Sequence, residues 1–380
     1  MRTLILKSLS ACNLRCAYCS LGSKEHPHRL SEPDTLRALR LFAERCTAEA
    51  EQNATVIFHG GEPMLLPPDQ YERCIRTVTA EYPALRFRFC MQTNGTLMTP
   101  EYLQLFRSCD IHIGVSLDGD SFVHDGQRTD AAGHGTYQTI LRNIRLLQEN
   151  QVPTAALMVV TKRALGGSLE FLREFDAMGL PLKINPLLSL GEAVSRPELS
   201  LQPGDYGRYL ARVFEYVAES RLALRISPIE ELLHAMLYEE PTCGCQYDPC
   251  CSRRFLCVDP QGVLYPCGRF ADGYKNPIGT LASGITAEGE TVLERLRRRR
   301  TTGLPDKCRT CEILQYCNAG CSSDHMETDE EVQPCASCED YLFFISYLKG
   351  RGMELLRQSL LHEKERLQSH IRRREAAYGL

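Results

Sequence analysis

The 380-residue sequence has no apolar run that approaches the ~18 residues that a membrane-spanning helix needs. Its amino terminus lacks the apolar core and cleavage site of a secretory signal peptide. A strong positive charge, which is typical of nucleic-acid-binding domains, is also missing, because the formal net charge is −4. These absences argue against membrane, secreted and nucleic-acid-binding proteins, and they predict a cytoplasmic location.

Cysteine, by contrast, is abundant, with 19 residues. Without a signal peptide, cysteines at short spacings predict metal ligands rather than disulfides. Three of them lie near the amino terminus, and the segment from Cys243 to Cys338 holds another group. The others are expected to be small buried residues: Cys46, Cys74, Cys90 and Cys109.

From residue 3 to about residue 190, apolar runs typical of strands alternate with amphipathic stretches typical of helices. The predicted strands are Thr3–Leu9, Thr55–His59, Arg86–Gln92, Ile111–Leu117, Thr154–Val160 and Leu182–Asn185. The predicted helices are Glu32–Gln52, Asp69–Tyr82, Pro100–Ser108, Thr136–Asn150 and Ser168–Met178, with Ser31 and Ser168 as candidate N-caps. Repeated strand–helix units predict an α/β fold with a parallel sheet, and six of them predict an open, partial barrel. Functional residues are then expected at the carboxyl ends of the strands.

The first predicted strand is followed by a C-x3-C-x2-C loop that contains Cys12, Cys16 and Cys19. Three thiolates can hold three irons of a [4Fe–4S] cube, and one iron then keeps an open position because no fourth cysteine is near. An open position is what a catalytic metal needs and a structural metal lacks. Zinc or buried thiols are the competing interpretations, and three ligands on one short loop disfavour them.

This loop resembles the signature of the radical S-adenosylmethionine (SAM) superfamily, in which an aromatic residue, here Tyr18, precedes the last cysteine. The resemblance implies that the open iron binds the amino and carboxylate groups of SAM. One electron from the cluster then cleaves SAM, and the resulting 5′-deoxyadenosyl radical takes a hydrogen atom from the substrate. Tyr18 matches a position whose side chain lies near the adenine, although an ordinary core tyrosine explains it nearly as well.

Two further strand ends resemble SAM-binding motifs of the superfamily. Gly60, Gly61 and Glu62 follow the second strand and look like its GGEP motif. The glycines let the backbone approach a ligand, and the glutamate can accept a hydrogen bond from the SAM ammonium group. Thr93 and Asn94 follow the third strand and offer polar groups to the same ligand. An ordinary Gly-Gly turn is the alternative for the first of these motifs.

The fourth strand ends on Ser116 and Asp118, which lie two residues apart and are therefore expected on one face. They resemble family contacts to the SAM ribose or carboxylate. Arg128 follows closely and is a candidate partner for the SAM carboxylate, with a solvated surface arginine as the alternative. The order and spacing of these motifs together identify a radical SAM domain.

The cysteine-rich segment resembles the SPASM extension of radical SAM enzymes that modify peptides and proteins. It contains the spacing C-x2-C-x5-C-x3-C, preceded by G-x4-C and followed by a last cysteine. The resemblance implies two auxiliary [4Fe–4S] clusters, and therefore three clusters in all. The implied ligands are Cys251, Cys257, Cys267 and Cys321 for cluster I and Cys308, Cys311, Cys317 and Cys338 for cluster II. The alternatives are Cys243, Cys245 or Cys250 in place of Cys251, Cys335 in place of Cys338, and zinc in place of iron.

The expected domains are a barrel (1–200), a helical linker (201–242), a SPASM domain (243–340) and a C-terminal helix (341–380). Within the SPASM segment, Arg295 and Arg297–Arg300 form a basic run that is expected to be a solvated helix face.

Two reactions compete within the resemblance. Anaerobic sulfatase-maturating enzymes oxidise a Cys or Ser side chain to formylglycine, and they carry an Asp directly after the cysteine that corresponds to Cys267. Here that position is Gly268, which cannot accept a proton. Asp272 is near in sequence, but no catalytic base is assigned. The sequence therefore favours a peptide maturase that cross-links side chains of a ribosomally made precursor through a C–C or thioether bond, with formylglycine formation as the alternative.

The expected partners are a precursor peptide or protein and an electron donor such as flavodoxin or ferredoxin. The sequence begins at the first barrel strand, so leader-peptide recognition is expected to involve the catalytic body or a separate protein. A non-catalytic iron–sulfur electron carrier is the alternative from another class, and the open-site loop and the SAM motifs argue against it.

Overall fold

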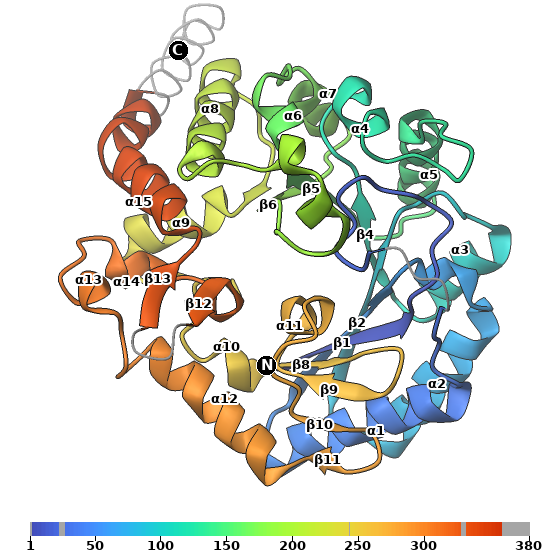
Figure 1. The fold of residues 1–380 in the computed structure, drawn as a ribbon. Helices are drawn as coiled ribbons and strands as arrows, with labels where there is room; N and C mark the ends of the chain where they lie inside the picture. The colour runs from blue at the N-terminus through green and yellow to red at the C-terminus, as the bar shows by residue number, and fades with distance from the viewer. Residues whose placement is uncertain (1, 23–26, 243, 328–331, 359–380) are drawn as a thin grey trace, which may run out of the picture.

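The computed structural model describes residues 2–22, 27–242, 244–327 and 332–358, with the side chains of residues 326–334 left undescribed. A curved sheet forms its centre, and helices cover the outer face of this sheet (Figure 1). All six predicted strands are present, as β1 (Arg2–Leu9), β2 (Asn53–Gly60), β3 (Arg86–Thr93), β4 (His112–Ser116), β5 (Thr154–Val160) and β6 (Leu182–Pro186). The helices between them are α1 (Glu32–Ala48), α2 (Pro68–Glu81), α3 (Pro100–Ser108), α4 (Ser121–Asp125), α5 (Tyr137–Glu149), α6 (Lys162–Leu165) and α7 (Phe171–Ala177). The predicted open barrel is confirmed.

The sheet continues beyond the predicted barrel at both edges. Its strand order is β11-β10-β9-β8-β1-β2-β3-β4-β5-β6-β7, where β7 is Ile226–Ser227. The cysteine-rich segment supplies β8 (Phe255–Val258), which pairs in parallel with β1, and then the antiparallel β9 (Val263–Tyr265), β10 (Gly279–Thr280) and β11 (Gly284–Ile285). This pairing covers an edge of β1 whose backbone groups would otherwise lack partners. The barrel and the cysteine-rich segment therefore share one sheet.

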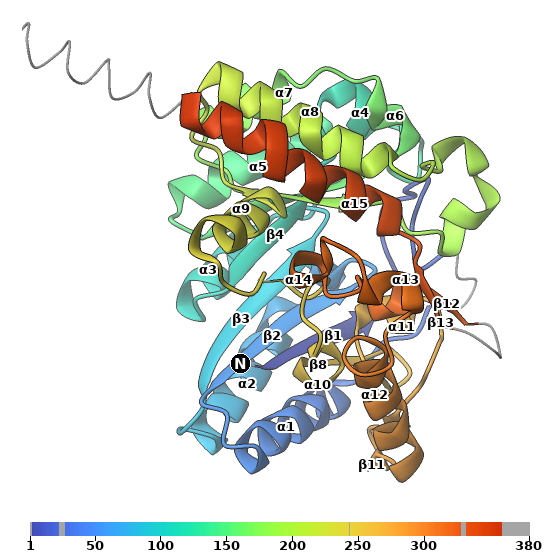
Figure 2. The ribbon, with the colours of Figure 1, turned by 90° about the vertical axis from the view of Figure 1, so that its left-hand side faces the viewer.

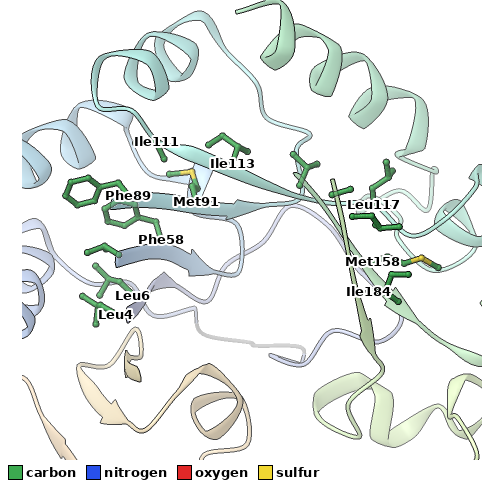
Figure 3. Close-up of a cluster of buried hydrophobic side chains, with 14 of the residues drawn as sticks. Leu4, Leu6, Phe58, Phe89, Met91, Ile111, Ile113, Leu117, Met158 and Ile184 are labelled. Carbon is green, nitrogen blue, oxygen red and sulfur yellow. The ribbon is translucent and has the colours of Figure 1, made fainter. Parts of the chain in front are cut away.

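Side chains alternate between the two faces of the sheet, as the pleat requires. Leu4, Leu6, Phe58 and Met91 belong to the core between the sheet and its helices, and all four are almost fully buried (Figure 3). Lys7 lies on the opposite, inner face of β1. Apolar side chains on the outer face of the sheet therefore pack against the helices, and Lys7 shows that the inner face also carries polar side chains.

The rest of the chain wraps the open side of the sheet. It contains α8 (Asp205–Ser220), α9 (Ile229–Tyr238), α10 (Cys251–Arg254), α11 (Gly268–Asp272), α12 (Ala287–Arg299), α13 (Asp306–Arg309), α14 (Leu314–Cys317), β12 (His325–Glu327), β13 (Val332–Cys335) and α15 (Cys338–Tyr347). The helix predicted after Cys338 is confirmed in α15, whereas residues 359–380 lie outside the described part. Helix α15 packs along α8, and the two helices lie side by side in both views (Figures 1 and 2).

The two predicted N-caps differ in outcome. Ser31 caps α1, because its side chain accepts a hydrogen bond from the Asp34 backbone N–H. Ser168 does not cap a helix, since α7 begins only at Phe171 with Glu170 as its N-cap residue. The Ser168 hydroxyl instead accepts from the Glu170 N–H at 3.2 Å, which closes a local turn ahead of the helix.

Candidate functional site

The loop with Cys12, Cys16 and Cys19 leaves the carboxyl end of β1, as predicted. Backbone hydrogen bonds of 2.8 Å from Arg15 N–H and Ala17 N–H attach it to the segment after α4. The three thiols are exposed or half-buried rather than enclosed. The loop is therefore held in place by its backbone, and none of its three cysteines is fully buried.

The two glycines of the GGEP motif bring this loop against the end of β2. Gly60 has a φ of +131°, and a side chain there would overlap the backbone carbonyl of Leu9. A side chain on Gly61 would overlap the carbonyl of Ala11. The glycines thus allow a close backbone approach, and in this structure the approaching group is the cysteine loop itself.

Glu62, the residue after the two glycines, is fully buried and accepts several hydrogen bonds. It accepts hydrogen bonds from Thr93 Oγ1 at 2.7 Å and from the backbone N–H groups of Asn94 (2.7 Å) and Met64 (3.0 Å). Burial raises the pKa of this carboxyl group to about 7. Two carboxylate oxygens offer about four acceptor sites in all, so one more donor has room to bind.

Asn94 links this group to the first cysteine. Its side-chain N–H donates to Asn13 Oδ1 at 2.9 Å and approaches the sulfur of Cys12 at 3.7 Å. Thr93, Asn94 and Glu62 therefore form one connected network beside the loop.

A second buried network contains Asp118, Arg128 and Tyr18. The Asp118 carboxylate accepts from Arg128 Nε (2.7 Å), Gln127 Nε2 (3.0 Å), Val159 N–H (2.9 Å) and the Tyr18 hydroxyl. Burial acts to raise the pKa of Asp118, but Arg128, His124 and the hydrogen bonds from Tyr18 and Val159 together hold the pKa below its usual value. Asp118 thus uses its acceptors within the protein and positions Arg128 and Tyr18.

Arg128 connects this network to the cysteine loop. Its guanidinium lies over the Tyr18 ring, 5.1 Å from the centroid, and its Nη1 donates to the Cys16 sulfur at 3.7 Å. The predicted alternative of a solvated surface arginine is excluded, because Arg128 is buried. Ser116 lies apart from this group and accepts from Gln92 Nε2 at 3.0 Å.

A lysine–aspartate pair that the sequence did not predict lies on the inner face of the sheet. Lys7 forms an ion pair with Asp272 and donates to the Gly268 carbonyl at 3.3 Å. Ser20, next to the cluster loop, donates to the other Asp272 oxygen at 3.0 Å. Burial acts to lower the pKa of Lys7, but Asp272, Cys257 and Cys267 together raise the pKa. The only sequence signal was a charged residue within an apolar strand.

The cysteines around α11 form the first group in the cysteine-rich segment. Burial raises the pKa of Cys267 far above its usual value, and the nearby thiols of Cys321, Cys251 and Cys245 act in the same direction. Cys251 is likewise within electrostatic range of Cys321 and Cys245. Three of the four predicted ligands of auxiliary cluster I therefore lie together, and Cys245 lies with them.

Cys257 lies in β8, where it is fully buried in a small apolar cluster against which Cys267 packs. The charged groups that act on its thiol are Lys7, Asp272 and Asp259 rather than the other cysteines. Cys245–Cys251 and Cys251–Cys257 have the same C-x5-C spacing, so spacing alone could not separate these two pairs. Cys243 lies outside the described residues.

The predicted ligands of auxiliary cluster II line one pocket. Its volume is about 430 Å³, counted with the solvent at its mouth. The cysteines in its lining are Cys308, Cys311, Cys317, Cys335 and Cys338. Both candidates for the last ligand, Cys335 and Cys338, are therefore present.

Arg300 corrects one expectation about the basic run. It is 3% exposed and points inward from the C-terminal end of α12, whereas its neighbour Arg298 is exposed. Its guanidinium donates to the Cys251 sulfur at 3.2 Å. The prediction of a solvated face is wrong for Arg300, because backbone carbonyls of the cysteine loop replace water as its acceptors.

Among the described residues, no three Cys, His, Asp or Glu side chains converge on one point as ligands of a single ion would. An iron–sulfur cube binds its thiolates on separate irons, so convergence on one point is not required of it. The described helices include none with the length and apolar character to cross a membrane.

Comparisons with known proteins now add to this geometry. The sequence profile of the Radical SAM superfamily matches residues 6–166. The chain is also 30% identical over 336 residues to a cysteine-type anaerobic sulfatase-maturating enzyme of Clostridium novyi. The aligned region covers 84% of this chain and 87% of that relative. The chain belongs to the radical SAM superfamily. It is therefore an enzyme that uses SAM and a [4Fe–4S] cluster, as predicted.

Other similarities extend the comparison. A serine-type anaerobic sulfatase-maturating enzyme of Klebsiella aerogenes is 27% identical over 344 residues, covering 89% of this chain and 83% of the relative. The structure of anSMEcpe with bound AdoMet and Kp18Cys peptide has a TM-score of 0.79 at 23% identity, covering 94% and 98% of the two chains. Streptococcus suis SuiB bound to its precursor peptide SuiA has a TM-score of 0.58 at 16% identity, covering 84% and 71%. At these identities the two structures show the shared fold.

Proposed function

We propose that this enzyme oxidises a Cys or Ser side chain of a protein substrate to formylglycine, as an anaerobic sulfatase-maturating enzyme. The observation that carries the proposal is the 30% identity to the cysteine-type enzyme along 84% of this chain and 87% of the relative. The similarity thus includes both the barrel and the cysteine-rich segment. It favours formylglycine formation over the cross-linking reaction that the sequence alone favoured.

The residues of the first loop fit the cluster and SAM. Cys12, Cys16 and Cys19 would hold three irons, and none of these cysteines is fully buried. Asn94 and Arg128 already direct N–H groups at two of these sulfurs. In our proposal the remaining acceptor site of Glu62 receives the SAM ammonium group.

Two further clusters are proposed for the cysteine-rich segment. Cluster I would use Cys245, Cys251, Cys267 and Cys321, so that Cys245 replaces Cys257 in the set expected from the sequence. Cluster II would use Cys308, Cys311, Cys317 and Cys338, and Cys335 would remain a neighbouring thiol. When bound, SAM and the first cluster supply a radical that takes one hydrogen atom from the substrate Cβ, and the auxiliary clusters supply an acceptor for one electron.

The oxidation must also remove one proton, from the thiol or hydroxyl group of the substrate. A serine becomes the aldehyde directly, whereas a cysteine becomes a thioaldehyde that exchanges its sulfur for water oxygen with release of H₂S. Gly268 cannot take this proton. We therefore assign it to Asp272, which lies one helical turn further along α11 and hence on the same helix face as Gly268.

The contacts of Asp272 suit this assignment. Lys7 forms an ion pair with its carboxylate. Ser20, which follows Cys19 directly, donates a hydrogen bond to the same carboxylate. Helix α11 lies on the inner side of the curved sheet, where a substrate side chain would enter (Figure 1). Asp272 is thus a carboxyl group held beside the cluster loop by Lys7 and Ser20.

The reaction is tested with oxygen-free, iron-reconstituted protein, SAM, a reductant and the Kp18Cys peptide that is bound in the anSMEcpe structure. A hydrazide reagent and mass spectrometry should detect an aldehyde at the cysteine. Loss of two hydrogens from a precursor peptide, with no aldehyde on any substrate, would instead establish the cross-linking maturase, which remains the second candidate because of Gly268.

The base is tested with Asp272→Asn. This variant should still cleave SAM but form aldehyde about 10²–10⁴-fold more slowly, the usual contribution of a general base. The control is the double variant Gly268→Asp/Asp272→Asn. A Cβ at residue 268 meets its nearest atoms, on Ile5 and Lys7, at 3.5–3.8 Å, so the new carboxylate fits beside Lys7. Recovery of aldehyde formation in the double variant supports the assignment, and an unimpaired Asp272→Asn variant refutes it.

A further inference from the structure

The basic run at the end of α12 contains one arginine whose surroundings differ from those of its neighbours. Arg300 follows three arginines in the last turn, where positive charge suits the helix C-terminus. Yet it is 3% exposed, and a buried guanidinium needs acceptors for its five N–H groups. The hydrogen-bond acceptors of Arg300 therefore indicate what this side chain does.

These acceptors belong mainly to the loop that carries two proposed ligands of auxiliary cluster I. Arg300 donates to the carbonyls of Cys245 (3.4 Å), Gln246 (2.7 Å), Asp248 (2.6 Å) and Asn318 (3.1 Å). Its Nη1 also donates to the Cys251 sulfur at 3.2 Å. Arg300 therefore holds this loop through several backbone carbonyls and also contacts the sulfur of Cys251, a proposed cluster ligand.

We infer that Arg300 is a positioning residue of auxiliary cluster I, which holds the loop of Cys245 and Cys251 and raises the reduction potential of the cluster through its hydrogen bond to the Cys251 sulfur. Reduction adds negative charge to the cluster, and a donor to sulfur stabilises that charge. A charged donor in a buried site does so more strongly than a neutral one. The inference rests on the proposed cluster I and is independent of whether the product is formylglycine or a cross-link.

The absence of a carboxylate among these acceptors strengthens the effect. Within the described residues, the hydrogen bonds of Arg300 go to four carbonyls and one sulfur, so its charge is not neutralised by a hydrogen-bonded acid. Its field therefore acts on the cluster thiolates. A cluster with a raised potential accepts an electron from the substrate more readily.

The test uses full-length protein in which Cys12, Cys16 and Cys19 are replaced by Ala, so that only auxiliary clusters remain, with about eight irons. A redox titration followed by electron paramagnetic resonance compares Arg300→Gln with this parent. We expect the midpoint potential of cluster I to fall by at least about 59 mV, a tenfold change in the ratio of reduced to oxidised cluster for one electron. The matched control is Arg298→Gln, which removes an equal charge from an exposed position of the same helix end and should leave the potential unchanged.

Arg300→Lys separates the two parts of the role. Lysine keeps the charge but not the planar fork, so its potential should lie between those of the parent and Arg300→Gln. If Arg300→Gln loses the iron of cluster I, the potential is read on Arg300→Lys. An unchanged potential in a variant with full iron content, an equal shift in Arg298→Gln, or loss of cluster I from both Arg300 variants would overturn the tuning role.

Discussion

The two cysteine loops of this enzyme each have a buried arginine that donates to a thiol sulfur, but the two arginines are balanced differently. Arg128, beside Cys16, is paired with the buried carboxylate of Asp118. Arg300, beside Cys251, is bound by backbone carbonyls. Cys12 in the first loop is exposed, whereas Cys251 beside Arg300 is half-buried and Cys321 is buried. This contrast suits our proposal, in which the first cluster binds SAM and auxiliary cluster I exchanges electrons.

The largest test of this contrast removes one loop at a time. Replacing Cys12, Cys16 and Cys19 by Ala should abolish cleavage of SAM to 5′-deoxyadenosine and leave about eight irons. Replacing Cys245 and Cys251 by Ala should instead retain SAM cleavage and abolish the oxidised peptide product. Chromatography of 5′-deoxyadenosine and iron analysis measure both, and SAM cleavage by the first variant would contradict the proposed division of roles.

A second prediction concerns the ligands within the second loop. Cys245→Ala should lose cluster I, leaving about eight of about twelve irons. Cys257→Ala should retain them all, because Cys257 faces Lys7 and Asp272 instead of the other cysteines. Iron and sulfide analysis of the two reconstituted variants distinguishes the sets, and the opposite pattern would restore Cys257 as the ligand.

The strands were predictable from the sequence, and the proposed ligand set of cluster I was not, for physical reasons. Alternating apolar residues such as Leu4 and Leu6 mark a strand whose outer face is covered by helices, and that pattern is local. Cys245 and Cys257 have the same spacing from Cys251, and the pairing of β8 with β1 brings Cys257 within electrostatic range of Lys7 and Asp272. That pairing joins segments more than 250 residues apart.

The functional role of a single side chain could be predicted only where the residue belongs to a recognisable motif. The loop cysteines and Glu62 could be found from their spacing after strands. Arg300 could not, because its burial depends on acceptors in another loop, and a run of arginines ordinarily indicates solvent exposure. Lys7 was missed for the same reason, since its partner Asp272 lies on a distant helix.

A third prediction concerns the ion pair between Arg128 and Asp118. Asp118→Asn leaves Arg128 buried without its carboxylate, which should lower the free energy of unfolding by about 3–5 kcal/mol. Urea unfolding monitored by circular dichroism measures this change. Asp306→Asn is the control, because its side chain is 96% exposed and the effect should stay within about 0.5 kcal/mol. Equal stability of the two variants would show that Asp118 does not balance Arg128.

The smallest expected effect concerns Glu62 and pH. Its pKa is raised to about 7 by burial, so the carboxyl group is protonated in the folded protein at pH values where the unfolded chain is ionised. The stability that it contributes is therefore fully present below its ordinary pKa and is lost as pH rises through about 7. Ionised Glu62 is the better acceptor for the SAM ammonium group, so SAM affinity should rise about tenfold across the same range, the value of one weak charged hydrogen bond. Glu62→Gln should remove both pH dependences while Glu312→Gln retains them, and calorimetric SAM titrations that are flat with pH in the parent protein would refute this role for Glu62.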